Sequence, residues 1–89
     1  MGGLEVKEKK IGYVSNYYSG ISVAAVEMTG TLSVNEIIHI KGHTTDLEIK
    51  VDSMQIDHES VTEVKQGDSI GLKVPERVRR KDKVYKKME

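Results

Sequence analysis

The sequence predicts an all-β protein and, within that class, a single antiparallel β-barrel of about six strands. Three observations indicate this fold. Apolar and polar residues alternate over short stretches such as Leu47–Val51 and Ile70–Val74, which is typical of strands with one buried face. Turn-forming residues recur about every ten positions. Helical periodicity is weak throughout, and residues 57–67 could form one helical turn at most.

The strands are expected in a simple order along the chain. A loose start over residues 1–10 leads into the first strand. The remaining elements are a hairpin over residues 9–28, a strand through Ile38 and Ile40 that ends at Gly42, a bent strand over 47–56, a strand over 68–74 that Pro75 ends, and a last strand over 81–86.

One of these strands carries an irregularity. Its apolar residues alternate over 47–51 and resume at Met54 and Ile56, one residue out of phase. A strand with a period of two can absorb such a slip only through a bulge or a bend, which we expect at Asp52-Ser53. Rolling a sheet into a small barrel requires bends of this kind.

A turn motif precedes the strand over 68–74. Gly67 can adopt backbone angles unfavourable for other residues, and the carboxylate of Asp68 can accept hydrogen bonds from nearby backbone amides. The same pattern, a turn-tolerant or polar residue followed by an acid and an alternating strand, recurs at Asn35-Glu36 and at Lys81-Asp82. Several strands are therefore expected to begin in the same way.

Length and composition limit the chemistry. A chain of 89 residues predicts one domain over residues 1–89, with a loose segment at 1–8 and a basic segment with the last strand at 76–89. The absence of cysteine excludes disulfides and thiolate chemistry. No apolar run approaches the roughly 18–20 residues of a membrane span, and the N-terminus lacks a signal-peptide pattern. A soluble, cytoplasmic protein without membrane contact is expected.

Charge is distributed unevenly along the chain. Residues 11–75 hold four lysines and nine carboxylates, a net charge of −5, whereas residues 76–89 hold seven basic and three acidic residues, a net charge of +4. The basic segment is a candidate phosphate-contacting surface, because arginine binds phosphate through two parallel hydrogen bonds. If residues 81–87 form a strand, Lys81 and Lys83 share one face. Two other roles for the basic segment remain open. Its charges could simply solvate the end of a small domain, or they could protect an edge strand from aggregation.

Tyrosines near the predicted hairpin tip are the second candidate for a binding surface. Tyr17 and Tyr18 are adjacent in a strand and must face opposite ways, so at least one is expected to be exposed. An exposed tyrosine can stack on a nucleobase or anchor a protein partner. The alternative is that one ring packs into the end of the barrel. The predicted binding residues are Tyr17, Tyr18, Arg77, Arg79, Arg80, Lys81 and Lys83.

Catalytic and metal chemistry is not expected. His39 and His43 lie on a strand and its turn without a convincing third ligand, so all three histidines are predicted to be surface residues. The carboxylates at 46, 48, 57 and 59 alternate with apolar residues and belong on a solvated face. We predict no catalytic residue, no metal, no cofactor and no enzymatic activity.

The elements resemble, in order, domain 2 of translation GTPases, the β-barrel that follows the nucleotide-binding domain in elongation factor Tu. The matching stretches are residues 11–42, "IGYVSNYYSGISVAAVEMTGTLSVNEIIHIKG", and 47–74, "LEIKVDSMQIDHESVTEVKQGDSIGLKV". The ending "RVRRKDKVYKK" is similar to the last strand of standalone elongation-factor-like proteins and to the barrel appended to collagenase-like peptidase-family enzymes. The chain departs from the family pattern at Asn35-Glu36, where Gly-Asp is frequent. It also lacks a phosphate-binding G-x-x-x-x-G-K-[ST] loop, so GTP hydrolysis is not expected.

The resemblance implies a non-catalytic binding module that contacts RNA or the translation machinery, since barrels of that family face the ribosome and tRNA. The alternative is a protein-interaction or accessory barrel that acts with a collagenase-like peptidase-family enzyme or another enzyme. A five-stranded oligonucleotide-binding barrel is a rival fold, although its usual aromatic platform is absent.

Overall fold

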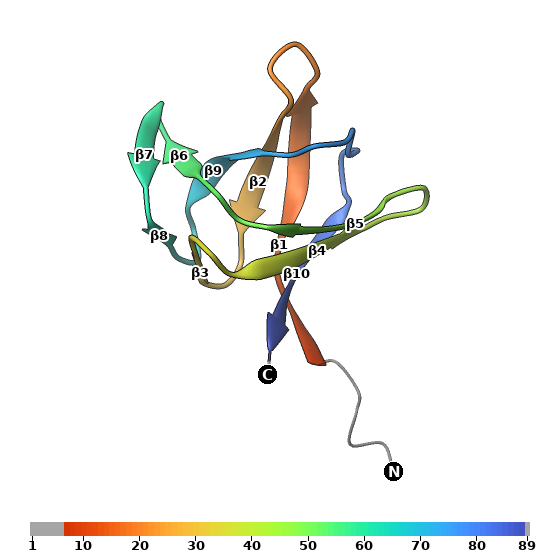
Figure 1. Cartoon of the computed structure of the whole chain (residues 1–89), viewed down its shortest axis with the longest axis horizontal. Coiled ribbons are helices and arrows are strands. Elements are labelled where there is room, and N and C mark those ends of the chain that lie inside the picture. Colours follow the sequence, from red (N-terminus) through yellow and green to blue (C-terminus); the bar gives the residue numbers. More distant parts are fainter. Residues whose placement is uncertain (1–6, 89) are drawn as a thin grey trace.

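A computed structural model gives the fold of residues 7–88, which form antiparallel strands joined by turns (Figure 1). The strands are β1 (Lys7–Tyr18), β2 (Val23–Met28), β3 (Leu32–Ser33), β4 (Ile37–Lys41), β5 (Asp46–Lys50), β6 (Met54–Ile56), β7 (Glu59–Val61), β8 (Glu63–Val64), β9 (Ser69–Lys73) and β10 (Lys83–Met88). The prediction of an all-β antiparallel protein is confirmed. None of the described chain forms a helix with the length and apolarity needed to cross a bilayer.

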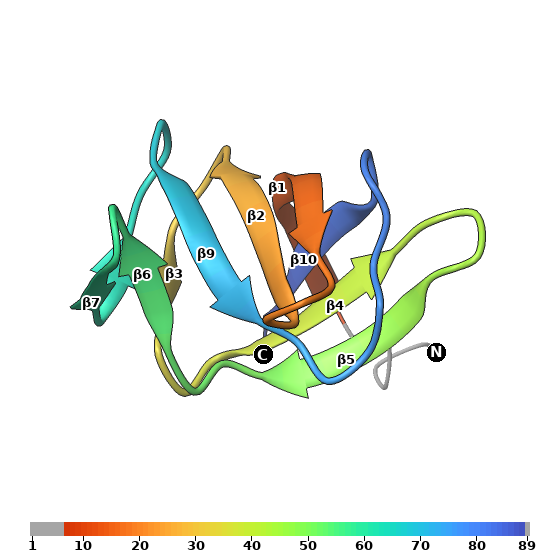
Figure 2. The same cartoon turned by 90° about the horizontal axis from the view of Figure 1, so that it is seen from above.

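The strands form two sheets. The larger has eight strands in the order β5-β4-β10-β1-β2-β9-β6-β7, and β3 pairs with β8 in a short ribbon. The larger sheet curls, so that β4 and β5 lie across from β9 and β6 (Figure 2). The prediction of six strands closed into a barrel was too simple. Residues 7–88 form ten strands instead of six, because the break at 51–53 divides one expected strand and because β7 and β8 form where one helical turn was expected. Within the same residues the end strands β5 and β7 do not pair.

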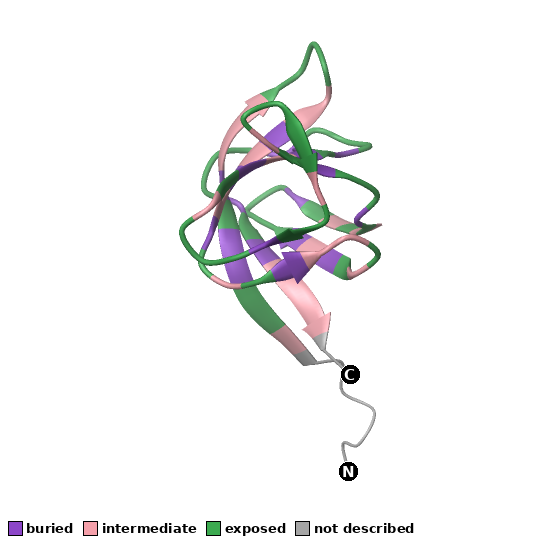
Figure 3. Cartoon of the chain, turned by 90° about the vertical axis from the view of Figure 1, so that its left-hand side faces the viewer, coloured by how far each residue is buried: buried purple, intermediate pink, exposed green. Residues whose placement is uncertain are grey.

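The core lies inside this curl (Figure 3). Apolar side chains supply it without any phenylalanine or tryptophan. Its buried members are Ile11, Val14, Ala24, Val26, Met28, Leu32, Ile38, Ile40, Val51, Met54, Val64, Ile70, Leu72, Val74, Val78 and Val84. The alternation predicted for β4 and β9 is confirmed, since each strand buries its two inward residues and exposes both ends. Burial of these side chains is the main favourable contribution to folding.

Bends interrupt the strands where the sequence pattern slips. Residues 51–53 between β5 and β6 are unpaired within the sheet, so the predicted break at Asp52-Ser53 is confirmed. Val51 remains hydrogen-bonded to the turn that precedes β4, since its amide donates to Glu36 O (2.9 Å) and its carbonyl accepts from Asn35 N (2.8 Å). The residues expected to form one helical turn instead make a tight turn at 57–58 followed by β7 and β8.

The turn motif before β9 has the predicted geometry. Gly67 has φ = 97°, in the left-handed region that favours glycine. Asp68 Oδ2 accepts a hydrogen bond from the backbone amide of Lys65 (2.9 Å), and the Asp68 amide donates back to Lys65 O (3.1 Å). This reciprocal pair fixes the reversal that starts the strand.

The two related turns repeat this arrangement. In each, the residue before the acid has a positive φ, and the acid accepts from the amide three residues earlier while donating back to that residue's carbonyl. The members are Ser33, Asn35 and Glu36 before β4, and Arg79, Lys81 and Asp82 before β10. Asp82 is buried, with 4% of its surface exposed, and it approaches Gly42 so closely that a Cβ there would overlap its carboxylate.

Two boundaries predicted at the chain ends need correction. The first strand begins within the segment expected to be loose, because Lys7 and Glu8 already belong to β1; residues 1–6 of that prediction lie outside the described residues. At the other end, Lys81 is a turn residue with φ = 75°, and β10 begins at Lys83. Lys81 and Lys83 therefore do not share a strand face.

Candidate functional site

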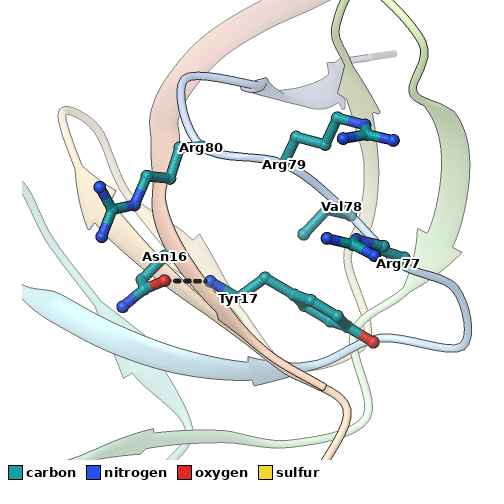
Figure 4. Close-up of a pocket in the computed structure, with 6 residues that line it drawn as sticks. All are labelled: Asn16, Tyr17, Arg77, Val78, Arg79 and Arg80. Atoms are coloured by element: carbon teal, nitrogen blue, oxygen red, sulfur yellow. Dashed lines mark hydrogen bonds between the residues drawn. The ribbon is translucent and has the colours of Figure 1, made fainter.

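Four of the predicted binding residues converge on a hollow between the end of β1 and the segment that links β9 to β10. It has a volume of about 260 Å³ and is lined by Asn16, Tyr17, Arg77, Val78, Arg79 and Arg80. We call it the arginine pocket (Figure 4). Its two walls come from residues about 60 positions apart in the sequence. It is slightly smaller than the roughly 300–1,000 Å³ typical of sites for drug-sized ligands.

A β-bulge in β1 places Tyr17 at this pocket. Val14 pairs with Val26 and Asn16 pairs with Ala25, so Ser15 is an extra residue in the ladder. The bulge shifts the side-chain alternation by one position. Val14 and Tyr17 can therefore both face the core side although they are three residues apart, and Tyr17 packs against the core cluster.

The opposite wall of the pocket is anchored at two points, first by Val78 and then by the residues that follow Arg80. Val78 is buried and inserts into the core, while its neighbours are exposed. The segment is then joined to β1, because the Lys81 amide donates to Val14 O (2.8 Å) and the Val14 amide donates to Asp82 O (2.8 Å). Asp82 Oδ2 in turn accepts from the Arg79 amide (2.8 Å). These contacts hold the arginine-bearing backbone close to Tyr17.

The pocket is strongly cationic. Within residues 7–88, no carboxylate lies within salt-bridge distance of Arg77, Arg79 or Arg80. Arg79 Nε donates to Thr44 Oγ1 (2.9 Å), which turns its guanidinium away from Tyr17 (Figure 4). Asn16 Oδ1 accepts from the Tyr17 amide (2.8 Å), so its side-chain nitrogen remains a donor at the rim. An anion would find several hydrogen-bond donors here.

The structure brings together four of the seven predicted binding residues. Tyr17, Arg77, Arg79 and Arg80 line the pocket, whereas Tyr18, Lys81 and Lys83 do not. Asn16 and Val78 also line it and were missed as site residues. Asn16 lies within β1 and gives no signal of a binding role in the sequence, and Val78 carries no signal beyond its apolar side chain between two arginines.

The hairpin tip beside the pocket is apolar and exposed. Tyr18, the last residue of β1, is 49% exposed, and Ile21 in the following loop is 61% exposed. This loop projects beyond β1 and β2 (Figure 1). The prediction that at least one of the adjacent tyrosines is exposed is confirmed, and the other, Tyr17, packs into the end of the fold as the alternative expected. Exposed apolar residues of this kind can contribute to a protein interface.

One predicted surface histidine is part of an ion network instead. His39 Nδ1 contacts Glu8 Oε2 (2.9 Å), and its Nε2 contacts Asp46 Oδ1. The hydrogen bond with Asp46, assisted by Glu8, raises the pKa of His39 above its ordinary value of 6.5. Hydrogen bonds from Lys41 and His39 lower the pKa of Glu8. The sequence gives no sign of this network, because Glu8 on β1 and His39 on β4 come together only through β10, which lies between these strands and pairs with both.

The remaining polar candidates are dispersed. His43 and His58 are exposed, as are the carboxylates at 46, 48, 57 and 59, which confirms the predicted solvated positions of these residues. In the part of the chain that the structure describes, no three metal-binding side chains gather into a candidate metal site. A second hollow of about 390 Å³ lies between Thr31 and residues 63–68 and combines both charge signs.

Comparison with known proteins relates this β-domain to part of a protease. Over 77 residues, 85% of the chain, it is 42% identical to the uncharacterized protease MJ0090 of Methanocaldococcus jannaschii. Identity at this level over most of the chain indicates homology. The chain spans only 19% of the length of that protease. No family model matches the chain.

Solved structures with the same fold come from the C-terminal domain of a putative U32 peptidase of Geobacillus thermoleovorans. One has a TM-score of 0.82, 11% identity and coverage of 91% of this chain and 93% of that domain. Its selenomethionine variant has a TM-score of 0.81, 10% identity and coverage of 85% and 96%. The chain is thus homologous to part of a protease and shares the fold of a domain of a putative U32 peptidase. The resemblance to translation factors stays a prediction.

Proposed function

We propose that the chain is a non-catalytic accessory domain that acts in the cytoplasm with the catalytic part of a collagenase-like peptidase-type enzyme. The observation that carries this proposal is the 42% identity to a protease of which the chain spans 19%. A module this similar to one portion of an enzyme is expected to serve the role of that portion. The enzyme's active site would then lie in the remainder of the protein.

The packing of the domain supports an accessory role. Its own apolar side chains fill the interior, and the two hollows lie at the surface with polar or charged linings. The exposed Tyr18 and Ile21 at the hairpin tip offer apolar area for contact with a partner protein. Burying a large aliphatic side chain contributes about 1.5–3 kcal/mol, which makes this tip the strongest candidate for an anchor.

A domain exchange tests the proposal. The matched segment of the M. jannaschii protease is replaced by this chain, and the chimera is compared with the intact protease and with a variant lacking the segment. We expect the chimera to regain the solubility and thermal stability that the truncated protease loses. A chimera that behaves like the truncated protein would contradict the proposal.

A second candidate function is contact with RNA, and the arginine pocket specifically favours it. Three arginines without carboxylate partners among the described residues line this pocket together with one aromatic ring. If RNA binds, the paired substitutions Arg79→Ala and Arg80→Ala should weaken binding and reduce its salt dependence. An RNA affinity no higher than that of an acidic control protein would rule this function out.

We also infer that the curled sheet is a variant of the translation-factor domain 2 barrel. The turn at Asn35-Glu36 before β4 supports this finer assignment, because the family frequently has Gly-Asp at that position. Superposition of an experimental structure on such a barrel tests it. A different order of equivalent strands would overturn the assignment.

A further inference from the structure

We propose that the arginine pocket is a subsite for one nucleotide of single-stranded RNA, with the base against the ring of Tyr17 and the adjoining phosphates on Arg77 and Arg80. This inference rests on the second candidate function and specifies where and how RNA is held.

The wall formed by Tyr17 suits a base. The ring is half-buried and packs on the core, so its position is fixed before a ligand arrives. It lies along the pocket, with the arginine-bearing segment facing it (Figure 4). A preorganised aromatic face stacks on any nucleobase. An acidic peptide has no comparable planar group to use this face.

The arginines suit phosphates. Arg77 and Arg80 are exposed, and within residues 7–88 neither pairs with a carboxylate or forms a side-chain hydrogen bond. They flank the pocket three residues apart on a backbone that Val78 anchors in the core. The guanidinium fork matches the geometry of two phosphate oxygens. Arg77 lies beside the ring of Tyr17, and Arg80 lies on the other side of the pocket near Asn16 (Figure 4). The two guanidinium groups can therefore contact the phosphates on either side of a stacked nucleotide.

The shape of the pocket favours a single strand. Its volume of about 260 Å³ is suited to one small group, and Tyr17 forms a wall inside the hollow. A base in a duplex is stacked on its neighbours and cannot offer its face to such a ring, whereas single-stranded RNA can turn a base outward.

Fluorescence anisotropy with four labelled probes tests the inference: an octamer of uridylate, an abasic ribose-phosphate octamer, an RNA duplex, and an oligoglutamate. We expect the uridylate octamer to bind about 5- to 150-fold more tightly than the abasic octamer, the range expected for one stacked base. The duplex should bind more weakly than the uridylate octamer. Equal affinity for the abasic octamer would overturn the inference, and equal affinity for oligoglutamate would assign the pocket to acidic peptides instead.

Matched variants locate the site. Arg77→Ala combined with Arg80→Ala should lower the slope of log affinity against log salt by about 1.4, or 0.7 for each lost phosphate contact. The control pair Lys9→Ala and Lys50→Ala removes the same charge from exposed positions outside the pocket. Equal effects of the two pairs would contradict the inference.

Substitution of Tyr17 tests stacking directly. Tyr17→Phe keeps the ring and should retain affinity, whereas Tyr17→Leu should lower affinity for uridylate toward that for the abasic octamer. If Tyr17→Leu unfolds the chain, the ring protons of wild-type Tyr17 provide the readout, because a stacked base should shift their NMR signals and the abasic octamer should not. An RNA affinity that is unchanged in all pocket variants would overturn the subsite but keep the second candidate function. The absence of any RNA binding would end both.

Discussion

The three related turns allow a test of how burial affects the contribution of a hydrogen bond to the free energy of unfolding. In each, a carboxylate accepts from the backbone amide three residues earlier. The distances are similar, 2.8 Å for Asp82 and 2.9 Å for Asp68. Their surroundings differ, because Asp82 is buried, whereas the hydrogen bond that Asp68 accepts is exposed to solvent.

We predict that Asp82→Ala destabilises the protein more than Asp68→Ala. Removing the Asp82 carboxylate leaves the Arg79 amide without its partner in a partly buried site, which costs about 1–3 kcal/mol. Water can replace the Asp68 carboxylate at its exposed amide, so that substitution should cost about 0.5–1 kcal/mol. Asp82→Asn keeps an acceptor oxygen and should cost less than Asp82→Ala.

Urea unfolding at 25 °C measures these differences. The chain contains no tryptophan and four tyrosines, so tyrosine fluorescence and far-ultraviolet circular dichroism serve as probes. With a slope of about 1 kcal/mol per molar urea, Asp82→Ala should lower the midpoint by about 1–3 M. Equal midpoints for Asp82→Ala and Asp68→Ala would refute the reasoning, because burial would then have no influence on the bond.

Other predictions concern glycines and the ion network. Gly42→Ala places a Cβ only 2.6 Å from Asp82 Cγ and should cost about 1–3 kcal/mol, seen as a thermal midpoint lower by about 4–8 °C for each kcal/mol. Gly67→Ala meets no atoms within 4 Å but forces alanine to φ = 97°, so we expect a smaller loss of about 1–2 kcal/mol in urea unfolding. Because the pKa of His39 is raised in the folded protein, its contribution to stability is complete below about pH 6.5 and lost as the pH rises through the folded value. The urea midpoint of the wild type should therefore fall as the pH rises from about 6.5 through the folded pKa of His39. An equally steep fall of the urea midpoint with pH in His39→Gln would contradict this assignment.

The sequence predicted the local features of the fold well, because they depend on adjacent residues. The turns at Asn35 and Gly67, the break at 52–53 and the buried face of β9 all follow from turn chemistry and a period of two. Lys81 shows the limit of this reasoning. Its positive φ belongs to the same turn motif, yet lysine gives no hint of that conformation, so the last strand was predicted to begin too early.

Sequence reasoning located only part of the candidate site, because the pocket depends on pairing between distant segments. The basic run and the tyrosine pair could be recognised as candidates. What could not be predicted was the bulge at Ser15, which turns Tyr17 toward the arginines, or the burial of Val78, which fixes their backbone. The network of Glu8 with His39 likewise joins residues 31 positions apart.

Association with a peptidase tests the central claim most directly. Isothermal titration of this chain into the M. jannaschii protease lacking its matched segment should give saturable, stoichiometric binding. The pair Tyr18→Ser and Ile21→Ser at the hairpin tip should weaken it at least about tenfold, whereas Ile37→Ser, another exposed isoleucine, should not. The absence of binding heat at several temperatures, or equal weakening by Ile37→Ser, would contradict the account.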